Sequence, residues 1–219
     1  MIIALPGEFF YSTSDCDRAF VENGILYIEG RINFEGLMYS LTYSLKGYSR
    51  CKYCGRELLS NKRTMDHMYP RVFGGVSIPD NLVPSCPSCN SRKSCLTAQQ
   101  FYHWRKFQST DKRERIFKKM VESNMQKIKN GILLPKEWIT YYDVTDVLEE
   151  ISFDEVSRDK EANERVEMFY FKYQHYSKPI LVSKNGWVFT GFHTLYHAKR
   201  HSIKNVPAIV LENVVHLSH

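Results

Sequence analysis

Two short cysteine pairs constrain the fold of this chain more than any other feature. Cys51 and Cys54 form one Cys-x-x-Cys knuckle, and Cys86 and Cys89 form the second. Two such pairs supply four soft thiolate ligands, which suit a tetrahedral zinc ion with no open coordination position. The segment between the knuckles is too short and polar to fold by burial alone, so zinc binding and local folding are coupled. The knuckles therefore predict a structural zinc site.

Other readings of the cysteines stay open at this point. A redox Cys-x-x-Cys or a chance pairing of knuckles would also give this pattern. The chemically rich insert that the knuckles enclose favours zinc. Cys16 and Cys95 lie outside the pairs, and we expect them to be small buried thiols.

Length and composition set outer bounds on the class of protein. The chain of 219 residues is 43% hydrophobic, which is enough for a packed core in one large or two small domains. No apolar run is long enough to span a membrane. The start, Met1 to Phe9, contains Glu8 and lacks a basic leader, so we expect no signal peptide. These observations predict a cytoplasmic protein with reduced cysteines and no membrane partner.

The positive charge is concentrated in the middle of the chain. Between Tyr48 and Asn130, seventeen Lys and Arg residues face six Asp and Glu residues, whereas the rest of the chain has thirteen against eighteen. A local basic field attracts polyanions, of which the phosphate backbone of nucleic acids is the commonest. A solvated, basic helix face is the alternative explanation.

The insert between the knuckles carries a recognisable motif. It reads Asp66-His67 before Pro70 and Gly74-Gly75, then Asn81-Leu82, and finally Cys89-Asn90-Ser91-Arg92-Lys93. This string resembles the HNH endonuclease family in its four-cysteine form. Family members show Asp-His before a Pro and a Gly-Gly turn, a middle Asn before apolar residues, and Cys-Asn-x-x-Lys or Cys-His-x-x-Lys opening a helix. The resemblance implies a zinc-bound ββα-metal domain that hydrolyses DNA phosphodiester bonds.

The resemblance also implies catalytic roles. His67 would be the general base, because neutral imidazole accepts a proton near physiological pH. Asp66 and Asn90 would hold a catalytic divalent ion, Mg²⁺ or Mn²⁺, which prefers oxygen ligands. Asn81 would brace the loop and fix the imidazole. Neighbouring residues on a strand point to opposite faces, so Asp66 and His67 can share a site only if the strand bends or the ion sits at its edge.

Basic residues around the motif are the predicted DNA contacts, and we expect a double-stranded substrate. Arg92 and Lys93 lie near the start of a helix, whose positive end favours phosphate. The predicted contacts are Arg71, Arg92, Lys93, Arg105 and Lys106. Cutting both strands with a single site per chain would favour a homodimer. His103 has no such context and is expected to be a packing or surface residue.

The pattern along the chain predicts an α+β protein in three blocks. Residues 1–47 form a β-rich segment, in which Ile25 to Ile28 and Leu37 to Leu45 are expected strands broken by glycines. Residues 48–131 form the nuclease domain. It ends in a helix with an apolar stripe, stopped by Gly131; the stripe comprises Phe117, Val121, Met125 and Ile128.

Residues 143–219 form the third block, an α/β domain with a helix over Val156 to Tyr176 and strands over Pro179 to Val182 and Val206 to Leu211. Together with Asn185-Gly-Trp187 and Gly191-Phe-His193, these strands resemble the core of ParB/sulfiredoxin-like domains. Those domains bind phosphate through a Gly-x-His-Arg box at a helix start. Here Thr194 stands where the Arg would be, which makes a nucleotide ligand doubtful.

A cluster of aromatic residues in this block is expected to be core, with stacking on bases as the alternative; it comprises Phe169, Tyr170, Phe171 and Tyr173.

Three functions follow from these patterns. The favoured function is a metal-dependent DNA endonuclease, because it uses every part of the motif. A zinc-ribbon module that binds nucleic acid without cutting would need Asp66, His67 and Asn90 only for structure. A ParB-like nucleotide switch would lose nucleotide binding in a His193→Ala variant.

Overall fold

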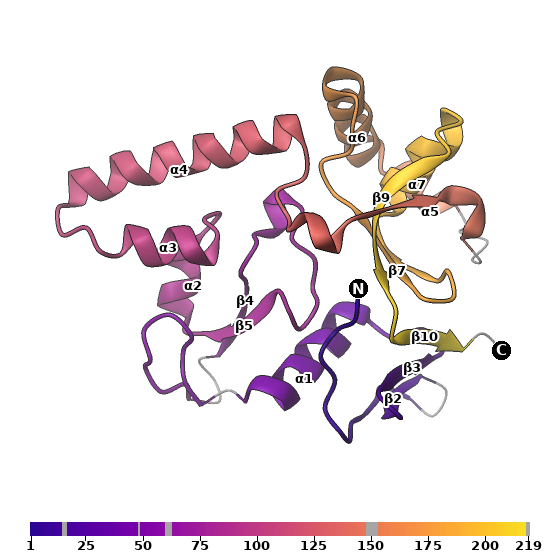
Figure 1. Ribbon diagram of the computed structural model, residues 1–219, viewed down its shortest axis with the longest axis horizontal. Coiled ribbons are helices and arrows are strands. Elements are labelled where there is room, and N and C mark those ends of the chain that lie inside the picture. The colour runs from indigo at the N-terminus through magenta and orange to yellow at the C-terminus, as the bar shows by residue number, and fades with distance from the viewer. Residues whose placement is uncertain (15–16, 48, 60–62, 148–152, 218–219) are drawn as a thin grey trace.

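The computed structural model describes residues 1–14, 17–47, 49–59, 63–147 and 153–217 (Figure 1). Cys16, which was predicted to be buried, lies outside the described residues. The described residues contain both helices and strands, which agrees with the predicted mixture of α and β structure.

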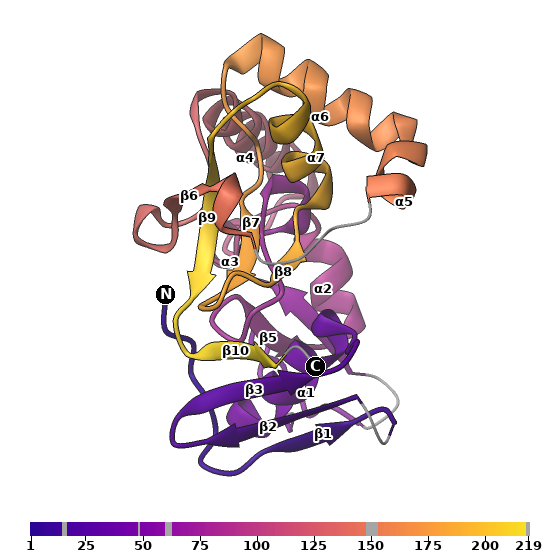
Figure 2. The same cartoon turned by 90° about the vertical axis from the view of Figure 1, so that its right-hand side faces the viewer.

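The first sheet combines both ends of the chain. Its order is β1-β2-β3-β10, and Figure 2 shows it below the rest of the molecule. The strands are Phe10–Ser12 (β1), Arg18–Glu22 (β2), Ile25–Glu29 (β3) and Val214–Leu217 (β10). The strand predicted at Ile25 to Ile28 is confirmed by β3. The last strand, β10, runs parallel to β3, with Val214 opposite Leu26.

The strand predicted over Leu37 to Leu45 is wrong, because this run lies in helix α1 (Phe34–Lys46). The buried residues Leu37, Met38 and Leu41 recur at helical spacing and form one apolar face. Asn33 caps the helix, since its side chain accepts a hydrogen bond from the Gly36 amide. Gly36 therefore lies within the first turn and does not break the element.

The middle of the chain forms a two-stranded hairpin followed by three helices (Figure 1). The elements are Thr64–His67 (β4), the short 3₁₀ helix Arg71–Phe73 (η2), Leu82–Ser85 (β5), Pro87–Lys93 (α2), Ala98–Trp104 (α3) and Thr110–Asn130 (α4). Gly131 ends α4, as predicted. Of the predicted stripe, Ile128 is buried but Met125 is 49% exposed. Asn124 is buried instead, and its side chain and that of Gln100 on α3 bond to each other at 2.8 Å.

The last block forms a second four-stranded sheet, in the order β6-β9-β7-β8, covered by helices. Its elements are Lys136–Trp138 (η3), Thr140–Asp143 (β6), Val144–Asp146 (η4), Phe153–Arg158 (α5), Lys160–Tyr173 (α6), Ile180–Ser183 (β7), Val188–Thr190 (β8), Phe192–Arg200 (α7) and Asn205–Leu211 (β9). The two predicted strands are confirmed by β7 and β9. The predicted long helix is two helices, separated at Asp159, which caps α6 through the Ala162 amide.

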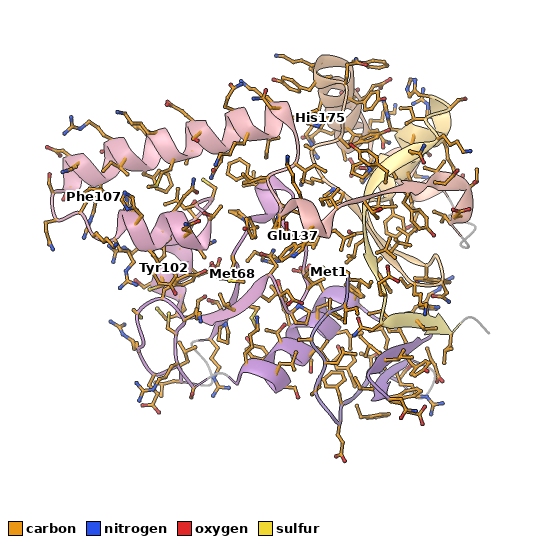
Figure 3. All side chains as sticks on the ribbon, viewed as in Figure 1. Met1, Met68, Tyr102, Phe107, Glu137 and His175 are labelled. Atoms are coloured by element: carbon orange, nitrogen blue, oxygen red, sulfur yellow. The ribbon has the colours of Figure 1, made fainter. Side chains whose placement is uncertain are left out.

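One apolar core joins the three blocks. It contains Leu37 from α1, Ile78 and Leu82 from the middle, and Leu181 and Ile209 from the second sheet. The block boundaries predicted from sequence thus separate segments that share buried surface. The ends of α4 and α6 also meet, because a ring nitrogen of His175 lies 3.1 Å from the Lys129 carbonyl oxygen (Figure 3). Among the described helices, none combines the length and apolarity that crossing a membrane requires.

Candidate active site and metal centre

The four paired cysteines converge at one point. Their sulfur atoms all lie within 4.8 Å of one another, and the Sγ atoms of Cys54 and Cys86 are 3.9 Å apart. Sulfurs held about 2.3 Å from a tetrahedral zinc ion are separated by about 3.8 Å. The cluster is therefore compatible with zinc. Figure 3 shows Tyr102 of α3 beside the first knuckle, where its hydroxyl donates to the Lys52 carbonyl at 2.9 Å.

Asp66 and His67 lie on β4, directly before the loop that leads to β5. In the hairpin Asp66 is opposite Val83, and His67 is opposite Leu82. Both side chains are buried, at 5% and 8% exposure. They also line the same shallow pocket of about 410 Å³, together with Arg71 and Lys93. The alternation of a strand therefore does not separate them from a common site.

The Asp66 carboxylate is held by two donors. Lys93 approaches its oxygens at 3.1 and 3.2 Å, and the Tyr53 hydroxyl donates a hydrogen bond to Oδ2. Lys93 also donates to the His67 carbonyl at 2.8 Å. Burial raises the pKa of Asp66, whereas Lys93 and Tyr53 act in the opposite direction.

His67 contacts a chain of polar side chains that leads to α1. Its Nε2 lies 2.9 Å from the Ser77 hydroxyl. Ser77 in turn bonds to Tyr39, whose hydroxyl donates to Glu35 at 2.5 Å. Arg71 completes the chain with an ion pair to Glu35 at 2.8 Å.

This chain determines which imidazole nitrogen is free. The Tyr39 hydroxyl donates its proton to the Glu35 carboxylate, because a carboxylate can only accept. The Tyr39 oxygen therefore accepts a hydrogen bond from the Ser77 hydroxyl. Ser77 then accepts from Nε2–H of His67. The lone pair of neutral His67 is consequently on Nδ1, and Nδ1 is the nitrogen available to take up a proton.

Burial lowers the pKa of His67 to about 4. The positive charges of Arg71 and Lys93 contribute to this lower pKa, and the negative charge of Glu35 opposes them. The imidazole is therefore neutral at physiological pH, which is the protonation state that a general base needs.

Asn81 ties together the two ends of the loop between β4 and β5. Its side chain accepts from the Tyr69 amide at 2.7 Å and donates to the carbonyls of Tyr69 and Val76 at 3.1 and 2.9 Å. It is completely buried. Among the described residues, Asn81 bonds to the backbone of Tyr69 and Val76 and not to the imidazole, so its effect on His67 passes through the loop backbone.

The other predicted residues are more dispersed. Asn90 is half-buried on α2, one helical turn before Lys93, and does not line the pocket with Asp66 and His67. The guanidinium carbon of Arg92 lies 5.6 Å from the centroid of the Trp104 ring, and Arg105 donates a hydrogen bond to the Tyr53 carbonyl. Arg92 and Lys106 are exposed.

Arg92 and Lys93 lie in the last turn of α2, so the prediction that they stand near a helix start is wrong, and Lys93 is buried. Its side chain is 1% exposed, and its ammonium group forms an ion pair with Asp66 and donates a hydrogen bond to the His67 carbonyl. A phosphate contact by Lys93 would require this ion pair to open.

Several residues at the site escaped the sequence analysis. Tyr53 lies inside the first knuckle, and Ser77 lies in the loop before Asn81, but neither type signals a role by itself. Glu35 and Tyr39 come from α1, outside the motif, although their i, i+4 spacing fits a shared helix face. Cys95 was expected to be buried, but it is half-buried at the edge of the pocket.

Comparison with known proteins identifies the segment that contains this site. Residues 51–95 match the family of HNH endonucleases. The match covers 45 of the 219 residues and includes both knuckles, Asp66, His67, Asn81 and Asn90. It implies nuclease activity on nucleic acids and use of a divalent metal ion. No curated protein matches the chain.

The ParB/sulfiredoxin-like resemblance of the last block is not supported by these comparisons and stays a prediction, as does the homodimer. In the structure the His193 Nδ1 lies 2.9 Å from the Asn163 side chain. His193 lines a cavity of about 960 Å³ that also contains Arg71 and Ser77 of the HNH segment. The aromatic cluster is only partly core, since Phe171 is 56% exposed.

The donors of the HNH segment suit a hard divalent ion. Asp66 has carboxylate lone pairs beyond those used by Tyr53 and Lys93, and it lies in the pocket with His67. Asn90 adds an amide oxygen on the adjacent helix. Lys93 supplies the positive charge beside Asp66, so a divalent cation and Lys93 would compete for the same carboxylate.

Proposed function

We propose that this protein is a metal-dependent DNA endonuclease that hydrolyses phosphodiester bonds at the pocket of Asp66 and His67. The observation that carries the proposal is the neutral, buried imidazole of His67, whose Nε2 contacts Ser77 while Nδ1 has no hydrogen-bond partner among the described residues. An HNH segment with this imidazole has the base that hydrolysis requires.

In the proposed reaction, His67 Nδ1 takes a proton from water as the water oxygen bonds to phosphorus. The bond from phosphorus to the leaving 3′ oxygen then breaks, the 3′ oxygen takes a proton from solvent water to leave as a hydroxyl group, and His67 returns its proton to solvent. Ser77 holds the imidazole in position, and the carboxylate of Glu35 favours the imidazolium that forms. Asp66 and Asn90 would hold Mg²⁺ or Mn²⁺, which supplies Lewis-acid stabilisation of charge on the phosphate oxygens.

The structural zinc and the basic surface have separate tasks in this proposal. Zinc bound by the four cysteines would fix α2 against the hairpin, and so keep Lys93 beside Asp66. The exposed side chains of Arg71, Arg92 and Lys106, with the partly buried Arg105, would bind the DNA backbone. The predicted role of Lys93 changes from phosphate contact to holding Asp66.

The test uses the purified full-length chain, supercoiled plasmid, and Mg²⁺ or Mn²⁺. We expect nicked or linear product only with the ion, and loss of at least about a hundredfold in rate in His67→Ala. Zinc content and DNA affinity should stay the same in that variant. His103→Ala is the matched control, since His103 is exposed on α3.

A non-cutting zinc-ribbon module would bind the plasmid without any ion-dependent scission, and that result would reject the endonuclease.

A further inference from the structure

A second group of metal-ligating side chains lies far along the chain from the HNH segment, between α6 and α7. Glu167 of α6, His197 of α7 and His201, which caps the C-terminus of α7, place one ligand atom each within 4.8 Å of the others. The two histidines are four residues apart, about one helical turn, so their side chains lie on the same side of α7. Their rings lie 4.4 Å apart, centroid to centroid.

His197 has an unpartnered nitrogen that points to a missing ligand. The residue is 4% exposed, and its Nε2 is a buried atom with no hydrogen-bond partner among the described residues. Its other nitrogen, Nδ1, lies 2.9 Å from the Tyr176 hydroxyl. A buried polar atom without a partner is costly, and a bound cation would satisfy it.

The spacing of the other two ligands fits a small transition-metal ion. His201 Nε2 and Glu167 Oε1 are 3.3 Å apart. Nitrogen and oxygen ligands about 2.0 to 2.1 Å from a tetrahedral zinc ion are themselves about 3.3 Å apart. Two imidazoles and a carboxylate form a donor set typical of zinc sites that keep a position for water.

The surroundings resemble those of a metal-bound histidine. With a metal on Nε2 of His197, Nδ1 carries the proton and donates to the Tyr176 oxygen, which fixes the ring orientation. The side chains of His201 and Glu167 are 31% and 35% exposed, so water can reach the open side. The nearby positive charge of Arg200 weakens binding relative to the four-cysteine site.

We propose that Glu167, His197 and His201 form a second zinc site, which clamps α6 to α7 and keeps at least one coordination position for water. The site is independent of the nuclease proposal, because none of its ligands lies in residues 51–95. Its removal should loosen the contact between the two helices while the cysteine site stays intact.

The experiment measures zinc per chain in the untagged full-length protein after equilibration with micromolar Zn²⁺. We expect two ions per chain in the wild type and one in His197→Ala, His201→Gln and Glu167→Gln. His193→Ala is the matched control on the same helix, and it should keep two ions. The wild type should also show a zinc-dependent rise in melting temperature that the three variants lack.

Cobalt substitution assigns the ions to their sites. Intense thiolate bands should persist in every variant, whereas the weaker bands from nitrogen and oxygen ligands should disappear in the three ligand variants. One ion per chain in the folded wild type would overturn the proposal. Retention of the second ion in folded His201→Gln and Glu167→Gln would overturn it as well, and these two positions are partly exposed, so their substitution does not open a cavity in the core.

Discussion

The Nε2 atom of His67 lies 2.9 Å from the hydroxyl of Ser77, and Ser77 in turn bonds to Tyr39 of α1. Through Ser77, Tyr39 and Glu35, a hydrogen-bonded chain extends from the imidazole to a carboxylate outside the residues matched to the family. The N-terminal block thereby takes part in the site, although the sequence assigned it no chemistry.

The first prediction concerns this chain. Ser77→Ala and Tyr39→Phe remove the partners that hold the imidazole, and we expect cleavage to slow roughly tenfold to hundredfold in Ser77→Ala and less in Tyr39→Phe. DNA affinity should not change. Tyr141→Phe is the control, since Tyr141 is 75% exposed. Full activity in Ser77→Ala would show that the contact does not position the base.

The second prediction concerns pH. The base must be neutral, and the pKa of His67 lies near 4, below the ordinary 6.5. As pH falls from 7 to 5.5, the neutral form therefore persists, whereas an unperturbed histidine would keep only about a tenth of it. We expect the rate to be nearly constant over this range, measured at saturating DNA and metal.

Charge variants should move the acidic fall in cleavage rate in opposite directions. Glu35→Gln removes the carboxylate that raises the pKa of His67, so the rate should fall at a lower pH than in the wild type. Arg71→Ala removes a cation that lowers this pKa, so the rate should fall at a higher pH. Identical profiles in both variants would contradict the electrostatic coupling.

The third prediction concerns the buried pair of Lys93 and Asp66. Lys93→Met leaves the carboxylate without its cation, which should reduce the free energy of unfolding by roughly 3 to 5 kcal/mol. The double variant Lys93→Met with Asp66→Leu should recover most of that loss but not the activity. Urea unfolding at constant zinc measures the stability of both variants, and plasmid cleavage measures their activity. Equal stability of Lys93→Met and wild type would show that the pair is dispensable.

The fourth prediction concerns the cysteine cluster. Cys86→Ser should release the zinc and unfold the HNH segment, because ion binding supplies the free energy that the small core lacks. Zinc analysis and circular dichroism check this, with Cys95→Ser as the control outside the cluster. A cooperative, active Cys86→Ser protein would remove the case for structural zinc.

The fifth prediction concerns Gly75 in the loop between β4 and β5, which follows His67. A Cβ atom at this position would lie 1.8 Å from the Tyr69 carbonyl oxygen, so the backbone must shift in Gly75→Ala. We expect a loss of roughly 1 to 3 kcal/mol in stability, together with slower cleavage. Gly55→Ala is the control for the steric clash, because no atom lies within 4 Å of the added Cβ at that position. The φ of +71° at Gly55 is itself unfavourable for alanine, so this variant measures the backbone effect alone.

Features that depend on spacing and side-chain chemistry could be predicted from the amino-acid sequence alone. The paired cysteines, the order of Asp66, His67, Asn81 and Asn90, and the stop of α4 at Gly131 are local patterns, and the match to residues 51–95 agrees with the motif. The error at α1 arose because a glycine in the first helical turn resembles a strand break when the cap at Asn33 is overlooked.

The tertiary structure supplies the surroundings of those residues. It buried Lys93 against Asp66, brought Ser77, Tyr39 and Glu35 to His67, and placed Glu167 beside His197 and His201. Apart from the His67–Ser77 contact, these contacts join elements distant in the chain, so no local periodicity encodes them. Packing α1 and both sheets into one core brings α1 against the hairpin loop, and burial there sets the pKa of His67.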